Sequence, residues 1–376
     1  MLAKGKTRAF FSASNRRSPF RPSPERKAAK IRELNLDTNG IPRIDRILPG
    51  AAIPGGDVTI YGSGFVPRPN SRPLVRFGST EASLLISAQD HLIARVPDGA
   101  LGGTVSVETS RAKSQPFAFH LGVQIADNLH PVASPAVDVE GNIYVTYSGQ
   151  RGQQVAVSLY KITANYTVKP FVTELMNPTG LALDREGYLY VSCRNDGTVH
   201  RVTSDGRAQL WVEGMGTATG LAFDTIGNLF VGDRSGTIFK ISPTREIFVF
   251  ATLEPSVSAY HLAFSPTGEL FVTGPTTSSF DRVFRINQKG EISTFFRGLG
   301  RPQGLAFDRM GNLYVTASYA GRRGIVRIAP DGKAEQVLGG SGLVGLALLP
   351  GHRAILATSG ALFSLDWDVE GLPLPR

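Results

Sequence analysis

GLAFDTIGNLFVG, from Gly220 to Gly232, is the stretch that decides the fold, because closely related lines recur along the chain. The other copies are GLALDREGYLYVS from Gly180, HLAFSPTGELFVT from His261 and GLAFDRMGNLYVT from Gly304, with weaker copies SPAVDVEGNIYVT from Ser134 and GLALLPGHRAILAT from Gly345. The starts are separated by 46, 40, 41, 43 and 41 residues, which defines six units of about forty residues.

Each complete unit contains four short apolar runs separated by turns. The first two runs are the quoted line, and in the unit from Gly180 the next two are residues 198–203 and 208–213. Four strands per forty residues without helical periodicity are typical of a β-propeller blade. The last unit supplies only three strands, so we expect Val123 to Asp127 to complete it and close a six-bladed ring over residues 122–376.

The segment before the repeats, residues 41–121, follows a different pattern. It reads IPRIDRILPGAAIPGGDVTIYGSGF, then LVRFGSTEASLLISAQDHLIARVPDGALGGTVSVETSRAKSQPFAFHL. About seven alternating strands broken by glycine and proline predict a small immunoglobulin-like sandwich. The whole folded part is therefore predicted to be all-β.

The charge lies almost entirely at the N-terminus. Residues 1–32 hold ten basic residues and one acidic one, which accounts for the whole net charge of +9, while the remaining 30 basic and 30 acidic residues cancel. Residues 1–40 are predicted to be a largely disordered basic tail with a short helix over about 24–35. Binding to nucleic acid or anionic lipid would rest on this tail alone.

Two family resemblances follow from these motifs. The order PxIxxIxPGxxxxGGxVTIxGxGF, VxFGxxxA and IxAxVP closely resembles IPT/TIG modules, which implies an adhesion, spacer or partner-contact unit without catalytic residues. The GLAFDxxGNLYV lines over residues 122–370 resemble the NHL-repeat and gluconolactonase (senescence-marker-protein) propellers. A TIG module ahead of such a propeller looks like a bacterial arrangement.

The resemblance to gluconolactonases implies a divalent cation, calcium or zinc, on the propeller axis, held by Glu, Asn and Asp side chains ahead of the innermost strands. The matching positions carry no carboxylate: they are Ala133, Thr179, Thr219, Tyr260, Gln303 and Val344. A hard cation needs several oxygen ligands, some of them charged, so we predict that this metal site is absent. His130 and His261 also lie near the axis, which leaves zinc binding as a weaker hypothesis and local hydrogen bonding as the alternative.

The loops after the second strands are predicted to surround the axial mouth with polar side chains. These residues are Tyr147, Arg194, Asn195, Asp196, Asp233, Arg234, Tyr319 and Arg322. Aromatic faces with Arg and Asp suit a small polar ligand, a sugar or a peptide. The alternative is that they are solvated loop residues.

Other motifs are interpreted as structural. Gly340, Gly342 and Gly345 form a GxGxxG, but no helix is predicted after it. The recurrent aspartates before the turn glycines are expected to cap hairpins; they are Asp138, Asp184, Asp224 and Asp308. The single cysteine, Cys193, is expected to be packed at a strand end.

The function we predict is noncatalytic binding of a small polar ligand, a glycan or a peptide or protein partner on the propeller face, without a cofactor. The alternative is a diverged metal-dependent lactonase or related hydrolase that holds one divalent cation such as calcium or zinc. A single cysteine and the lack of a recognisable signal or membrane-spanning run favour the cytoplasm.

Overall fold

The computed structural model describes residues 41–65, 72–277 and 280–374, and every regular element in these ranges is a β-strand. The predicted basic tail and its helix at 24–35 lie outside the described residues. Within those ranges, no helix is long and apolar enough to cross a membrane. The prediction of an all-β chain is confirmed.

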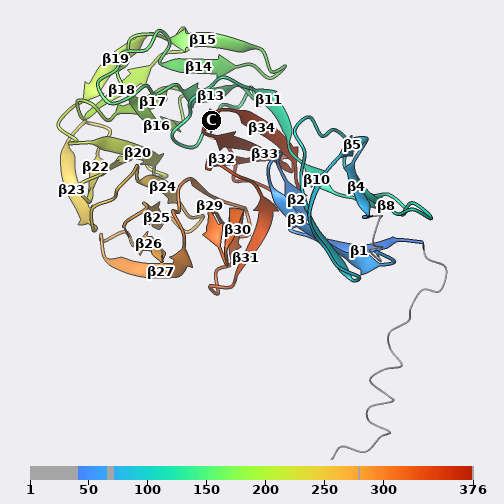
Figure 1. The fold of residues 1–376 in the computed structure, drawn as a ribbon. Helices are drawn as coiled ribbons and strands as arrows, with labels where there is room; N and C mark the ends of the chain where they lie inside the picture. The colour runs from blue at the N-terminus through green and yellow to red at the C-terminus, as the bar shows by residue number, and fades with distance from the viewer. Residues whose placement is uncertain (1–40, 66–71, 278–279, 375–376) are drawn as a thin grey trace, which may run out of the picture. The chain divides into compact units, whose positions relative to one another are not determined.

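Six sheets are arranged around a central axis, and each corresponds to one sequence repeat (Figure 1). The first three, which we call blades 1 to 3, are β12 (Ala136–Val137), β13 (Ile143–Thr146), β14 (Leu159–Ile162) and β15 (Val168–Val172); β16 (Pro178–Leu183), β17 (Leu189–Cys193), β18 (Thr198–Val202) and β19 (Ala208–Val212); and β20 (Ala218–Phe223), β21 (Leu229–Asp233), β22 (Thr237–Ile241) and β23 (Ile247–Thr252).

Blades 4 to 6 complete the ring. They are β24 (His261–Phe264), β25 (Leu270–Thr273), β26 (Asp281–Ile286) and β27 (Ile292–Leu299); β28 (Leu305–Phe307), β29 (Leu313–Tyr319), β30 (Arg322–Ile328) and β31 (Ala334–Gly339); and β32 (Leu343–Leu349), β33 (Arg353–Thr358), β34 (Leu362–Asp366) and β11 (Val123–Ala126). Strand β11 pairs antiparallel with β34, Val123 opposite Ser364, so the predicted closure of blade 6 by the segment after the sandwich is confirmed.

Aromatic side chains of the second strands pack between neighbouring blades. Tyr190 of β17 contacts Trp211 of the same blade and Phe223 of the next, with ring centroids 5.1 and 4.9 Å apart. Phe230 of β21 makes the equivalent edge-to-face contacts with Phe250 and Phe264, at 4.9 and 5.1 Å. The aromatic residue in the middle of the Leu-x-Val run of these second strands therefore packs one blade against the next.

The segment at residues 41–121 forms the predicted sandwich. One sheet has the order β1 (Arg43–Leu48), β3 (Asp57–Ser63), β7 (His91–Arg95) and β6 (Ser83–Ser87), and the other has the order β5 (Thr80–Glu81), β4 (Leu74–Phe77), β8 (Thr104–Glu108) and β9 (Phe117–Ala118). Alternate residues such as Val58, Ile60, Phe77, Leu92 and Val105 point inward and are buried, as expected of two packed sheets.

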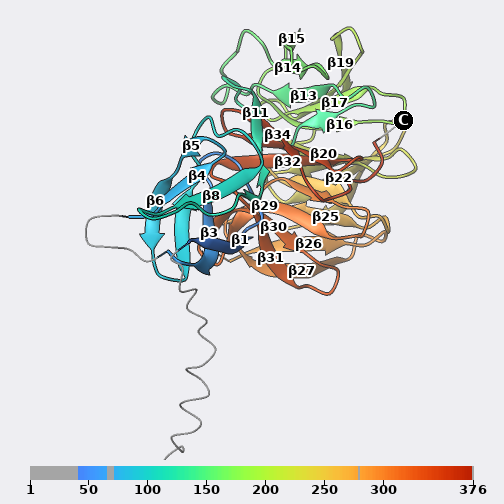
Figure 2. The same ribbon diagram turned by 90° about the vertical axis from the view of Figure 1, so that its right-hand side faces the viewer.

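Two short sandwich strands extend a propeller blade instead of the sandwich sheets. Strand β2 (Ala51–Ala52) pairs in parallel with β31, Ala51 opposite Leu338, and β10 (His120–Leu121) pairs with the other edge of β2. Blade 5 therefore belongs to a sheet of six strands. Figure 2, like Figure 1, shows the sandwich at one edge of the propeller. No local sequence pattern predicts this joint.

Candidate functional site

The loops that follow the second strands and the connections between blades lie on one face of the ring, which we call the rim face. The second strand runs in the same direction in every blade, so the residues after β13, β17 and β21 reach this face together. Tyr147, Arg194 and Arg234 directly follow these strands, as predicted, and Asp233 ends β21. Asn195 is exposed beside Arg194, and Tyr319 ends β29 in blade 5.

Asn177, which sequence analysis did not identify, organises the loop of blade 1. Its side-chain oxygen accepts the Gly152 amide at 2.7 Å, and its side-chain nitrogen donates to the carbonyls of Gly149 and Gln150 at 3.1 and 2.8 Å. Arg194 donates from Nη2 to the same Gly149 carbonyl at 3.0 Å. The long loop after β13 is thus fastened to blade 2 at Arg194.

Ser148, Arg194 and Arg234 occupy one structural position in three consecutive blades. Each lies fourteen residues after the start of its repeat. Their backbone amides donate to the incoming connection of their own blade, at His130 O (3.3 Å), Asn177 O (3.2 Å) and Thr217 O (3.2 Å), respectively. Ser148 Oγ, Arg194 Nε and Arg234 Nε are all buried and have no hydrogen-bond partner.

Three arginines, Arg151, Arg194 and Arg234, place positive charge near this position. Burial lowers the pKa of Arg194, and the positive charges of Arg234 and Arg151 lower it further. None of the ion pairs in the described part of the chain involves any of these three arginines. The rim face of blades 1 to 3 therefore holds three neighbouring cations that no carboxylate neutralises directly.

The carboxylates of the rim face are used to hold loops. Asp233 is buried; Oδ1 accepts the Thr217 amide at 2.8 Å, and Oδ2 accepts the hydroxyl of Ser235. Asp196 accepts the Thr198 hydroxyl at 2.9 Å.

Asp281, which sequence analysis missed, plays the same part in blade 4. It accepts the Thr276 amide at 2.9 Å and the Arg301 amide at 3.2 Å. Over the described residues, no three His, Cys, Asp or Glu side chains are placed to share a metal ion. The residues present therefore do not fit the cation that the resemblance to gluconolactonases implied.

The hydroxyls of the axial threonines and of Tyr260 bond to the backbone, and Thr219 joins blade 3 to the connection that enters blade 4. Their role as ligand-binding residues stays a prediction. Thr219 Oγ1 donates to Gly232 O at 2.7 Å and accepts the Tyr260 amide at 3.1 Å. Thr179 Oγ1 donates to Asn177 O at 3.2 Å, and the Tyr260 hydroxyl donates to Glu254 O. All three residues are about 1% exposed.

His261 and Gln303 complete the predicted axial set. His261 is 4% exposed, and burial lowers its pKa to about 4, so the imidazole is neutral at neutral pH. The Gln303 amide donates to Thr316 O at 2.9 Å, and its carbonyl accepts the Thr273 hydroxyl. Gln303 thereby ties blade 4 to blade 5 through its backbone.

The opposite face carries the hairpin turns, and we call it the hairpin face. Asp138 and Asp308 accept the amides of Asn142 and Asn312 at 2.8 Å, and their second oxygens accept the side-chain amides of the same residues, also at 2.8 Å. Asp184 and Asp224 cap their turns in the same way. The interpretation of these aspartates as hairpin caps is confirmed.

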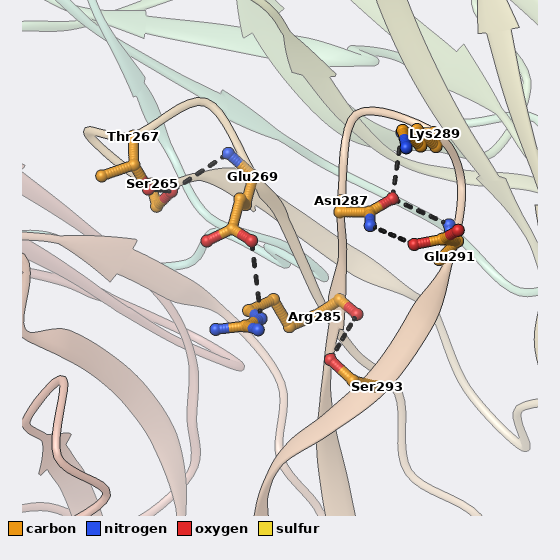
Figure 3. Close-up of polar contacts among 8 residues, drawn as sticks. All are labelled: Ser265, Thr267, Glu269, Arg285, Asn287, Lys289, Glu291 and Ser293. Carbon is orange, nitrogen blue, oxygen red and sulfur yellow. Dashed lines mark hydrogen bonds and ion pairs between the residues drawn. The ribbon is translucent and has the colours of Figure 1, made fainter.

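Blade 4 uses other side chains for the same purpose (Figure 3). Ser265 stands at the aspartate position, and its hydroxyl accepts the Glu269 amide at 3.1 Å. In the second hairpin, Asn287 Oδ1 accepts the amides of Lys289 and Glu291 at 3.0 Å each. Ser265 and Asn287 therefore cap the two hairpins of blade 4.

A groove of about 1000 Å³ also opens on the hairpin face, between blades 2, 3 and 4. Tyr188 and Trp211 line it, and Arg201 stacks over the Tyr188 ring at 4.6 Å. The C-terminal residues Leu372 to Leu374 form part of its wall. This chain therefore already covers one side of the groove with its own C-terminal segment.

Cys193 is packed beneath the rim face, as expected. Burial raises the pKa of its thiol to about 12, and the charge of Asp196 contributes to the same shift. The thiol stays protonated at neutral pH and is a poor nucleophile.

Residues 42–120 match the IPT/TIG domain. No curated protein matches the chain in sequence. An auxiliary nutrient binding protein from Bacteroides thetaiotaomicron is similar in structure, with 12% identity, a TM-score of 0.52, and coverage of 88% of this chain and 99% of that chain.

Two further structures are similar over most of their length. A second auxiliary nutrient binding protein, from Bacteroides ovatus, has 12% identity and a TM-score of 0.50, with coverage of 86% of this chain and 97% of that chain. A gluconolactonase from Xanthomonas campestris has 16% identity and a TM-score of 0.54, with coverage of 66% and 90%. At these identities the likeness shows the fold alone. The chain thus joins an IPT/TIG domain at residues 42–120 to a six-bladed propeller of the fold that gluconolactonases and nutrient-binding proteins share.

Proposed function

We propose that the protein is a noncatalytic binding protein that takes a small polar ligand on the rim face of blades 1 to 3. The observation that supports this is that three of the six buried side-chain atoms without a hydrogen-bond partner in the described residues lie at one position, Ser148 Oγ, Arg194 Nε and Arg234 Nε. Buried polar groups in folded proteins are nearly always hydrogen-bonded, because an unmade bond costs about 1–3 kcal/mol. A ligand that supplies acceptors would recover that cost.

Several features of the site favour binding over catalysis. The carboxylates of Asp196 and Asp233 are committed to loop hydrogen bonds, so neither is placed as a free general base or metal ligand. The Ser148 hydroxyl has no hydrogen-bond partner, so no base activates it as a nucleophile. The Cys193 thiol is buried and protonated. Positioned donors without an activating partner suit recognition.

The similar structures support a binding role as one of two possibilities for this fold. Two of them are described as nutrient binding proteins and one as a gluconolactonase. Lactone hydrolysis by that propeller family would depend on a cation site for which the described residues of this chain offer no carboxylate cluster. We therefore propose ligand binding as the function, and the test must exclude lactone hydrolysis.

The test combines ligand binding with turnover. Thermal shift and calorimetry with a panel of sugars, sugar acids, amino acids and lactones should identify a ligand that binds and is recovered unchanged. Asn195→Trp places a large ring at an exposed position on the rim face and should abolish binding. Lys333→Trp makes the same change at an exposed turn between β30 and β31 on the hairpin face and should leave binding intact.

A second experiment measures whether the protein hydrolyses lactones, which would contradict the proposal. Each lactone of the panel is incubated with calcium, zinc or a chelator, and product is measured. Hydrolysis that the chelator stops would overturn the binding proposal and favour the diverged hydrolase. Binding that survives Asn195→Trp but is lost in Lys333→Trp would move the site to the hairpin face.

A further inference from the structure

Arginine occupies the position described above in two blades only. Blades 1, 2 and 3 carry Ser148, Arg194 and Arg234 there, whereas the equivalent residues fourteen positions into the repeats of blades 4, 5 and 6 are Pro275, Ser318 and Ser359. The guanidinium groups therefore belong to one arc of the rim face. Blades 4, 5 and 6 form complete sheets without an arginine at this position, so ring closure does not require the charge.

Each guanidinium is anchored through Nη2 and has a buried Nε–H without a partner. Arg194 Nη2 donates to Gly149 O at 3.0 Å, and Arg234 Nη2 donates to Val257 O at 3.0 Å. These bonds anchor the two side chains to loops on opposite sides, blade 1 for Arg194 and blade 4 for Arg234. The Nε–H of each arginine remains without an acceptor. Since a guanidinium has five donors and no acceptor, only an acceptor group can satisfy it.

The positive charge of the arc also favours an acceptor that carries negative charge. Arg151 and Arg234 lie close enough to Arg194 to lower its pKa, after burial as the larger cause. The nearest acidic residues in sequence are already engaged, Asp233 by the Thr217 amide and Asp196 by the Thr198 hydroxyl. Like charges held together in a partly buried site are unfavourable until a counter-charge enters.

We propose that the ligand of the rim face is an oxyanion, a small molecule with a carboxylate or phosphoryl group, held between Arg194 and Arg234 with the Ser148 hydroxyl as a further donor. This inference rests on the proposed function and names the chemical class of the ligand. Arginine forks match the planar pair of oxygens of a carboxylate and two oxygens of a phosphoryl group. Ser148 extends the donor set toward blade 1, where its hydroxyl is buried and unpartnered.

The test uses probes that differ in charge but share a sugar skeleton. Calorimetry on the full chain compares glucose, gluconate, glucose 6-phosphate and inorganic phosphate at low and high salt. We expect at least one of the anions to bind about tenfold or more tightly than glucose and to weaken as salt rises, because charge-assisted hydrogen bonds are the stronger ones. Gluconate against glucose 6-phosphate distinguishes the carboxylate from the phosphoryl source.

Variants assign the binding to the two arginines. Arg194→Gln with Arg234→Gln should weaken binding of the anion by about tenfold or more. Arg207→Gln is the matched control, since Arg207 lies in a hairpin-face turn of blade 2 and pairs with Asp205. If the double variant fails to fold, the single variants and Arg194→Lys with Arg234→Lys replace it; lysine keeps the charge but loses the Nε–H, so binding should weaken in part.

Three results would overturn the inference. They are no binding of any of the three anions at millimolar concentration, equal binding by the double variant and the native chain, or no anion that binds more tightly than glucose. In the last case, loss of glucose binding in Asn195→Trp would show that the proposed rim-face function holds while the assignment of an anion fails. The failure of the inference and that of the proposed function are therefore distinguishable.

Discussion

Arg194 and Arg234 show which properties of a site residue can be predicted from the sequence and which cannot. Their position directly after a predicted strand placed them on the rim face, and the structure agrees. Their lack of an acceptor at Nε was not predictable, because it depends on which carbonyls and carboxylates the neighbouring blades present. Ser148 was overlooked for the same reason, since a serine in a loop has no local signature of burial.

The axial residues have a role in the structure that the sequence did not specify. Thr179 and Thr219 were expected to offer oxygens to a ligand because they precede the innermost strands. In the folded ring their hydroxyls bond to the backbone, Thr179 to Asn177 O and Thr219 to Gly232 O. A threonine at a strand start is equally suited to both roles, so only the spacing between blades distinguishes them.

At the scale of the residue, protonation of His261 should make the free energy of unfolding depend on pH. Its pKa is lowered from 6.5 to about 4 by burial. In the unfolded chain the imidazole takes up a proton below about pH 6.5, whereas the folded protein does so only near pH 4. The free energy of unfolding should therefore fall by up to about 3 kcal/mol as pH drops through this window, and this group should contribute no slope above it.

Urea unfolding of the native chain and His261→Gln across this pH range measures the effect. The variant should lose less stability than the native chain on acidification, because its side chain does not titrate. His130→Gln, a change at an exposed histidine, is the control and should keep the native slope. Equal slopes for the native chain and His261→Gln would contradict the assignment.

At the scale of the element, the blade hairpin is the unit that the sequence specifies best. The turn glycine, the capping aspartate and the aromatic residue of the second strand recur together, and each has a local physical role. Asp308, for example, accepts the Asn312 amide and side chain at 2.8 Å each and the Tyr314 hydroxyl at 3.2 Å. Burial, with the charge of Asp308, raises the pKa of Tyr314, so this phenol remains a donor.

Asp308→Ala should lower the free energy of unfolding by about 2–3 kcal/mol, since it leaves buried donors without an acceptor. Asp308→Ser should cost about half as much, because the serine of blade 4, Ser265, shows that a hydroxyl accepts the corresponding backbone amide. Asp331→Ala, in an exposed turn, should change stability by less than about 0.5 kcal/mol. Chemical denaturation of the three variants checks the order, and equal losses for Asp308→Ala and Asp331→Ala would refute the capping role.

At the scale of the whole molecule, the joint between sandwich and propeller is the main feature that sequence analysis missed. Ala51 and Ile53 are fully buried in the same hydrophobic cluster as Leu338 and Leu343 of the propeller. The Ile53 amide donates to Gly339 O at 3.0 Å. The domain boundary at residues 121 and 122 stays a prediction, because strand β2 of the sandwich shares a core with blade 5.

Gly56→Ala should uncouple this joint. A Cβ atom at this position would lie 2.3 Å from Gly339 O, so the two backbones would have to move apart. We expect a loss of about 2–4 kcal/mol and, in differential scanning calorimetry, separate melting of the sandwich and the propeller. Gly50→Ala is the control, since a Cβ there meets nothing within 4 Å. A single transition at the native temperature for Gly56→Ala would show that the contact does not couple the two.

The sequence was sufficient for the six blades, the closure of the last blade by Val123 to Ala126 and the sandwich before them. These depend on short-range patterns that repeat: apolar runs of strand length, turn glycines and capping aspartates. The rim-face arc and the Gly56 contact with Gly339 required the folded chain. They join residues that are far apart in sequence, and their character depends on which polar groups find partners there, which no local pattern specifies.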